Sequence, residues 1–117
     1  MLQSVLQDDP NIAVSFITPV EVASAVWRQF RQTRDDVAWR RAELRYAALQ
    51  SGWTVIDEYE AALTEARRLI SRHRLRAADA IQLACARVSG DTLPVVTLDK
   101  ELAAAARAEG FPVLTVD

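Results

Sequence analysis

The sequence predicts an α/β fold of three layers, α/β/α, in which helices cover both faces of a parallel sheet. Short and nearly continuous apolar runs recur along the chain, and such runs are typical of strands buried on both faces. Longer segments with helical periodicity separate these runs. Strands that are joined by helices pair in parallel and follow right-handed crossovers.

Length and composition fit one ordinary globular domain, residues 1–117. Half of the residues are hydrophobic (50%), 26% are charged, and the net charge is −2. This balance excludes a disordered chain and a generally basic nucleic-acid-binding protein. The apolar runs are too short to cross a bilayer, and residues 1–11 do not resemble a secretory signal. Cys85 has no second cysteine to pair with, so we expect a small buried hydrophobe and a cytoplasmic protein.

The elements follow the order βααβααβαβ. We expect strands at residues 12–17, 53–56, 93–98 and 112–116, and helices from residue 18, at 36–50, at 57–72, at 77–88 and at 100–109. Pro19 suits a first helical turn, and Thr18 with Glu21 matches a capping box. Asp57 and Asp99 are placed to cap the helices that follow them. Ala62, Leu63, Ala66, Leu69 and Ile70 should form the inward face of the third long helix.

Three acidic residues lie where the carboxyl ends of the strands should meet. Glu21 follows the first strand, Asp99 follows the third, and Asp79 begins the helix that precedes that third strand. A crossover helix runs antiparallel to its strands, so its start also lies at their carboxyl edge, where open α/β sheets bind ligands. The topology therefore predicts that the three acids converge on one rim.

Each acid also has a purely structural interpretation. Glu21 could complete the capping box, Asp99 could be an N-cap, and Asp79 could favour a helix start through the dipole. Taken singly, Glu21 and Asp99 favour the structural role. Asp79 is harder to explain in that way, because it lies on an apolar helix where a carboxylate is costly unless something compensates it.

Clustered carboxylates repel one another, and a hard divalent cation relieves this repulsion. Mg²⁺ prefers oxygen ligands and keeps several waters, which suits phosphate chemistry. The chain has no Cys/His zinc spacing, no Gly-rich phosphate loop and no Ser/His/Asp signature. The carboxylate–metal site is therefore the catalytic arrangement that the sequence supports.

Two arginine clusters have a functional and a structural interpretation. One spans residues 28–45 and the other residues 72–76, which include His73, the only histidine. Such clusters can hold phosphates, but a solvated helix face is the more common explanation for each. We expect His73 to lie at the surface near a helix end rather than to act as a ligand or base.

Four segments resemble the PIN-domain family, and within it the VapC-type toxin ribonucleases of type II toxin–antitoxin systems. They are residues 18–25, 75–84, 96–102 and 110–114, and the resemblance extends over nearly the whole chain from Ile12. It implies an endoribonuclease that uses Mg²⁺ or Mn²⁺, with Glu21, Asp79 and Asp99 as catalytic and metal-binding acids and Thr97 in support. It also implies an RNA substrate, a cognate antitoxin partner, a homodimer and no membrane association.

The resemblance also assigns a role to the paired helices of residues 19–50. They would form an arm that meets a second subunit or an antitoxin helix, with Trp27, Phe30, Trp39 and Tyr46 on it. Packing of these aromatic residues in a core is an equally good interpretation.

One part of the family pattern is missing. Family members begin with a central strand that ends in an aspartate, whereas residues 1–11 read as the end of the helix that should follow that strand, and neither Asp8 nor Asp9 matches the aspartate. The chain could be a truncated family member, which we favour, a degenerate toxin that retains antitoxin binding, or a domain whose strand is supplied by another chain. The corresponding functions are a ribonuclease with impaired activity, or a non-catalytic module that binds an antitoxin or dimerises. A third function is a plain structural subunit whose acids are all caps.

Overall fold

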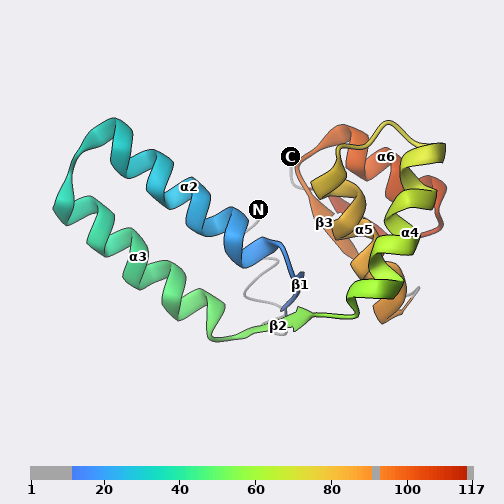
Figure 1. Ribbon diagram of the computed structural model, residues 1–117, viewed down its shortest axis with the longest axis horizontal. Coiled ribbons are helices and arrows are strands. Elements are labelled where there is room, and N and C mark those ends of the chain that lie inside the picture. Colours follow the sequence, from blue (N-terminus) through green and yellow to red (C-terminus); the bar gives the residue numbers. More distant parts are fainter. Residues whose placement is uncertain (1–11, 91–92, 116–117) are drawn as a thin grey trace.

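The computed structural model describes residues 12–90 and 93–115, and it confirms the α/β class with parallel strands (Figure 1). Asp8 and Asp9 lie outside the described residues. The elements are β1 (Ile12–Ser15), α2 (Thr18–Thr33), α3 (Asp36–Gln50), β2 (Trp53–Ile56), α4 (Tyr59–Arg72), α5 (Ala77–Ser89), β3 (Val95–Thr97), α6 (Lys100–Ala108) and β4 (Val113–Thr115). Their order agrees with the predicted one.

The strands form two parallel pairs rather than the single sheet that the sequence predicted. β1 pairs with β2, with Ile12 opposite Trp53, and β3 pairs with β4, with Val95 opposite Val113. Among the described residues, β1 and β3 do not pair with each other. The sheet is therefore interrupted between β1 and β3, where the family pattern expects one more strand.

The core lies between α4, α5 and α6. Leu69, Leu83 and Cys85 are its largest fully buried side chains, and small alanines on all three helices let the backbones approach closely. Burial raises the pKa of the Cys85 thiol, which fits the expected role as a small hydrophobe. Leu63 and Ile70, predicted to face inward, are 48% and 46% exposed. Each lies one position beyond a buried residue, so the helix turn directs it to the edge of the apolar face.

Helices α2 and α3 form an arm that projects away from the rest of the molecule (Figure 1). Neither helix has a buried residue. Trp39 of α3 holds the arm together, because its ring centroid lies 5.0 Å from that of Trp27 and 5.4 Å from that of Phe30, both on α2. Tyr46 remains 37% exposed. Trp27, Phe30 and Trp39 therefore pack against one another, and Trp27, at 43% exposed, also faces solvent as Tyr46 does.

Two predicted helix caps are wrong. The N-cap of α2 is Ile17, without a side-chain cap, and the hydroxyl of Thr18 instead bonds to that of Ser15 at 3.1 Å. The capping box fails because Thr18 is already inside the helix. Asp57 does not cap α4 either: the N-cap residue is Glu58, also without a side-chain bond, and the Asp57 carbonyl accepts from the Tyr59 N–H at 2.8 Å.

Candidate metal-binding site

The three predicted acids all lie at the starts of helices. Glu21 is in the first turn of α2, directly after β1, and Asp79 is in the first turn of α5. Asp99 follows β3 and is the N-cap residue of α6. Helix starts that adjoin the carboxyl ends of β1 and β3 occupy the same edge of the α/β arrangement.

Asp99 is held firmly by the loop between β3 and α6. Its Oδ1 accepts from the N–H groups of Glu101 at 2.8 Å and Leu102 at 3.0 Å, which confirms the N-cap prediction. The Thr97 hydroxyl accepts from the Asp99 N–H at 3.0 Å. Both cap bonds use Oδ1, so Oδ2 remains available to a ligand. The structural and the metal-binding interpretations of Asp99 are therefore compatible.

Asp79 lies in an environment that disfavours its charge. Partial burial raises the pKa of this carboxyl, the charge of Asp99 raises it further, and Glu101 adds to the effect. Only Arg76 acts in the opposite direction among these causes. Asp79 and Asp99 are thus close enough to repel each other, and a bound cation would offset both the burial and the repulsion.

Glu21 contacts α5 through Gln82, a residue with no role predicted from the sequence. The Gln82 side chain donates from Nε2 to Glu21 Oε1 at 2.8 Å, across 61 positions of the chain. Gln82 lies one turn after Asp79 on the same helix. A single glutamine at such a separation carries no local signal in the sequence, so only the folded chain shows this contact.

The three acids do not form a closed metal centre in the described part of the chain. Within residues 12–90 and 93–115, no group of three or more His, Cys, Asp or Glu side chains is placed to hold a metal ion. The structure brings Asp79 and Asp99 together and ties Glu21 to the same helix. Mg²⁺ is commonly held by one or two carboxylates with several waters, so the oxygen donors of this pair suit it.

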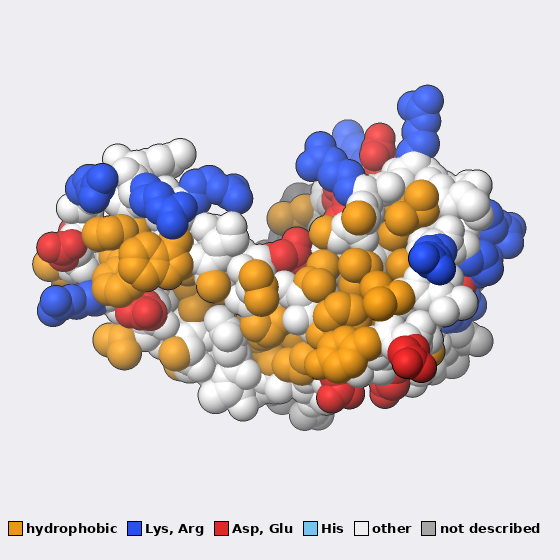
Figure 2. All heavy atoms as spheres, in the orientation of Figure 1, with side chains coloured by type: hydrophobic (Ala, Val, Ile, Leu, Met, Phe, Trp, Pro, Cys, Tyr) orange, Lys and Arg blue, Asp and Glu red, His pale blue; other side chains and the backbone are white. Residues whose placement is uncertain are grey.

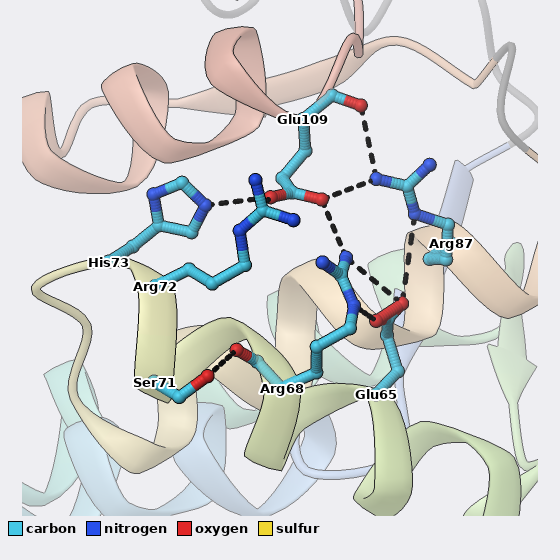
Figure 3. Close-up of polar contacts among 7 residues, drawn as sticks. All are labelled: Glu65, Arg68, Ser71, Arg72, His73, Arg87 and Glu109. Carbon is cyan, nitrogen blue, oxygen red and sulfur yellow. Dashed lines mark hydrogen bonds and ion pairs between the residues drawn. The ribbon is translucent and has the colours of Figure 1, made fainter.

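A second polar cluster was not predicted from the sequence (Figure 3). Glu109, whose side chain is only 6% exposed, accepts from Arg68 at 2.6 Å and from His73 and Arg87 at 2.8 Å each. These bonds, with that from His73 the strongest, lower the pKa of Glu109 to about 2. His73 does cap the end of α4, as expected, but its ring is a partly buried hydrogen-bond partner of Glu109 rather than a surface group.

This cluster joins the carboxyl ends of α4, α5 and α6, whereas the acids lie at the starts of α5 and α6. Arg87 is eight positions after Asp79 on α5, which corresponds to about 12 Å along the helix axis. Arg72 also faces Glu109, with 3.9 Å between Nε and Oε2, although 62% of its side chain is exposed. The polar cluster around Glu109 and the acids Asp79 and Asp99 therefore lie at opposite ends of α5 and α6.

Comparison with known proteins supports the fold. No helix in the described part of the chain is long and apolar enough to span a membrane. Neither the curated proteins nor the solved structures that were compared contain a match to the chain. The family model described as PIN domain matches residues 2–108, which is most of the sequence. Together with the parallel strand pairs and the acids at their carboxyl edge, this match shows that the chain belongs to the PIN domain family.

Proposed function

We propose that this protein is a metal-dependent endoribonuclease of the VapC toxin type, which uses Mg²⁺ or Mn²⁺ to hydrolyse RNA. PIN domains are typically nucleases and usually use divalent metal ions. Two parts of the proposal go beyond this family property: that the substrate is RNA, and that the protein acts as a toxin. The observation that carries the proposal is the partly buried Asp79, whose pKa is raised by burial and by Asp99 at the rim.

The three acids have distinct proposed roles. Asp79 and the free oxygen of Asp99 would hold the cation, with Thr97 and the helix start keeping Asp99 in place. Glu21, whose side chain is exposed and oriented by Gln82, would provide a further ligand or accept a proton. A bound divalent cation would supply an activated water and charge stabilisation at the scissile phosphate.

The arm offers a surface for the RNA backbone. Arg28, Arg31, Arg40, Arg41 and Arg45 are exposed on α2 and α3. Figure 2 shows Lys and Arg side chains gathered along one edge of the arm. Guanidinium groups bind phosphates well, and this second observation favours a phosphate contact for the first arginine cluster.

Cleavage of a fluorescently labelled single-stranded RNA tests the catalytic proposal. We expect Mg²⁺ to support cleavage, EDTA to abolish it, and Asp79→Asn to lower the rate by at least about 100-fold. Glu43→Gln is the matched control, since Glu43 is an exposed acid on α3 away from the rim. Cleavage that persists in EDTA, or an unaffected Asp79→Asn variant, would contradict the mechanism.

The exposed apolar residues of the arm favour a second function, a non-catalytic module that dimerises or binds an antitoxin. Leu44 is 73% exposed, Val20 70%, Val37 62% and Leu49 47%. Large apolar side chains gathered on one projecting element mark protein interaction sites more often than isolated ones do. This function and the ribonuclease function are compatible, because Asp79 and Asp99 lie at the starts of α5 and α6, outside the arm. We place both in a cytoplasmic toxin–antitoxin pair.

Sedimentation velocity tests the interaction role of the arm. We expect the protein to form a homodimer that the Leu44→Glu variant dissociates. Leu63→Glu is the control, because Leu63 is a leucine exposed to 48% on α4, outside the arm. If the wild-type protein is a monomer with RNase activity, only the ribonuclease function remains supported. A dimer without RNase activity would favour the non-catalytic module.

A further inference from the structure

The helix α2 fixes the backbone of Glu21 but not its side chain. Glu21 lies in the first turn, and its N–H donates to the carbonyl of the N-cap residue Ile17 at 3.0 Å. The side chain itself is exposed, and an exposed glutamate has several rotamers of similar energy. A second group is therefore needed to hold the carboxylate in one place.

Gln82 of α5 is this second group. Its Nε2 donates to Glu21 Oε1 at 2.8 Å, and a charged acceptor strengthens a hydrogen bond. Gln82 is partly buried and precedes Leu83, which is only 1% exposed and belongs to the core. The donor is thus carried by a well-packed helix, and the bond occupies one of the two oxygens of Glu21.

The position of Gln82 on α5 relates Glu21 to Asp79. Asp79 and Gln82 are three positions apart, so they lie on one face of the helix, about 4.5 Å apart along its axis. The hydrogen bond therefore holds Glu21 at the face of α5 that carries Asp79. Mg²⁺ keeps several of its waters, so a carboxylate near the ligands can act on a bound ion through water. This agrees with the finding that no three acids of the described residues are placed to bind one ion directly.

A carboxamide suits this task chemically. It donates a hydrogen bond without carrying a charge. Lysine or arginine at position 82 would also donate, but its positive charge would oppose the binding of a cation beside Glu21, and glutamate would repel the carboxylate. Glutamine therefore holds the Glu21 side chain and leaves its negative charge available to a cation.

We propose that Gln82 is a positioning residue of the metal site, which acts through Glu21 by holding its carboxylate at the Asp79 face of α5. This inference rests on the proposed function, because that function assigns Glu21 to the site. Groups that hydrogen-bond the carboxylates of a metal site typically contribute about 10- to 100-fold to metal affinity or activity. Loss of the Gln82 donor should therefore weaken Mn²⁺ binding by about tenfold or more.

Calorimetric titration of the metal-free protein with Mn²⁺ tests the inference without RNA. Methionine matches glutamine in length but has no donor, so Gln82→Met, Glu21→Gln and the double variant are compared with the wild type. We expect each single variant to bind Mn²⁺ about tenfold or more weakly. The double variant should bind no more weakly than Glu21→Gln alone, because Gln82 then has no carboxylate to position. Gln29→Met, which changes an exposed glutamine of α2, is the matched control and should bind as the wild type does.

Gln82→Lys is a second variant, which keeps a donor to Glu21 but adds a positive charge. It should weaken Mn²⁺ binding at least as much as Gln82→Met does. Wild-type affinity in both position-82 variants would overturn the inference. A further loss of affinity in the double variant would also overturn it, because Gln82 would then act independently of Glu21.

RNA cleavage by the same proteins separates this inference from the proposed function. If Gln82→Met binds Mn²⁺ weakly and the wild type cleaves no RNA, the positioning role stands and the ribonuclease function fails. If the wild type cleaves RNA and Gln82→Met equals it in both assays, the function stands and the positioning role fails. A wild type that does not bind Mn²⁺ would overturn both.

Discussion

Asp79 is unfavourable for folding when it is ionised, and it is one of the acids that we propose as metal ligands. Its pKa in the folded chain is raised above the ordinary value of 3.8. The folded state therefore binds the proton more tightly than the unfolded state, and stability falls as the pH rises from about 3.8 through the raised value. Ionisation of Asp79 therefore destabilises the metal-free protein, and a bound cation would offset this effect.

We therefore expect Asp79→Asn to raise the melting temperature of the metal-free protein at neutral pH and to remove most of the stabilisation by Mn²⁺. A ligand present at 100 times its Kd stabilises a native protein by about 2.7 kcal/mol, which a thermal shift assay detects easily. Glu43→Gln should leave the response to Mn²⁺ unchanged. If Asp79→Asn responds to Mn²⁺ as the wild type does, the cation is bound elsewhere.

Asp99 combines a helix cap with a proposed ligand, and two substitutions separate these roles. Asn caps a helix nearly as well as Asp, whereas Ala loses the cap and costs about 1 kcal/mol. We expect Asp99→Asn to keep the free energy of unfolding but to lose RNA cleavage, and Asp99→Ala to lose both. Urea unfolding and the cleavage assay measure the two effects. Full activity in Asp99→Asn would reduce Asp99 to a structural residue.

At the scale of the element, the sequence predicted the bounds of some helices and strands correctly and those of others too long. The bounds of α3 and β2 match the prediction, because Gly52 and the polar residues around Asp35 mark clear breaks. The expected strands at 12–17 and 93–98 are shorter, at Ile12–Ser15 and Val95–Thr97. Apolar sequence continues past the last hydrogen-bonded pair in both cases, so composition alone overestimates strand length.

The turn between α2 and α3 contains a strained position. Arg34 has φ of 54° and ψ of 26°, in the left-handed region, and its N–H donates to the Phe30 carbonyl at 2.7 Å. Glycine adopts this conformation without a Cβ penalty, so Arg34→Gly should stabilise the protein by about 0.5 to 1 kcal/mol. Arg40→Gly, inside α3, should instead cost about 1 kcal/mol. Thermal unfolding distinguishes the two, and a destabilising Arg34→Gly would contradict the expectation.

At the scale of the whole molecule, Glu109 ties together helices that are far apart in the sequence. Its pKa is lowered to about 2, so its contribution to stability is present above the ordinary value of 4.5 and is lost as the pH falls toward 2. Arg68 and Arg72 are partly exposed, and solvent screening reduces this contribution.

Glu109→Gln should therefore destabilise the protein by about 1 to 3 kcal/mol at neutral pH, since it leaves the partly buried His73 and Arg87 with a weaker acceptor. The difference from the wild type should shrink as the pH falls below 4.5, the ordinary value for this carboxyl. Urea unfolding over that pH range is the measurement, with Glu43→Gln as the exposed control. A difference that does not change with pH would show that Glu109 acts through packing rather than charge.

The sequence by itself determined the order of elements, the parallel α/β class and the helix starts at which Glu21, Asp79 and Asp99 lie. These features depend on local periodicity, capping and chain direction, all of which can be read from neighbouring residues. Only the tertiary structure decided that burial and Asp99 raise the pKa of Asp79, that Gln82 bonds to Glu21, and that Glu109 joins three helix ends. It also divided the strands into two pairs with a groove between them. Such features depend on contacts between residues tens of positions apart, and a single sequence carries no local signal for them.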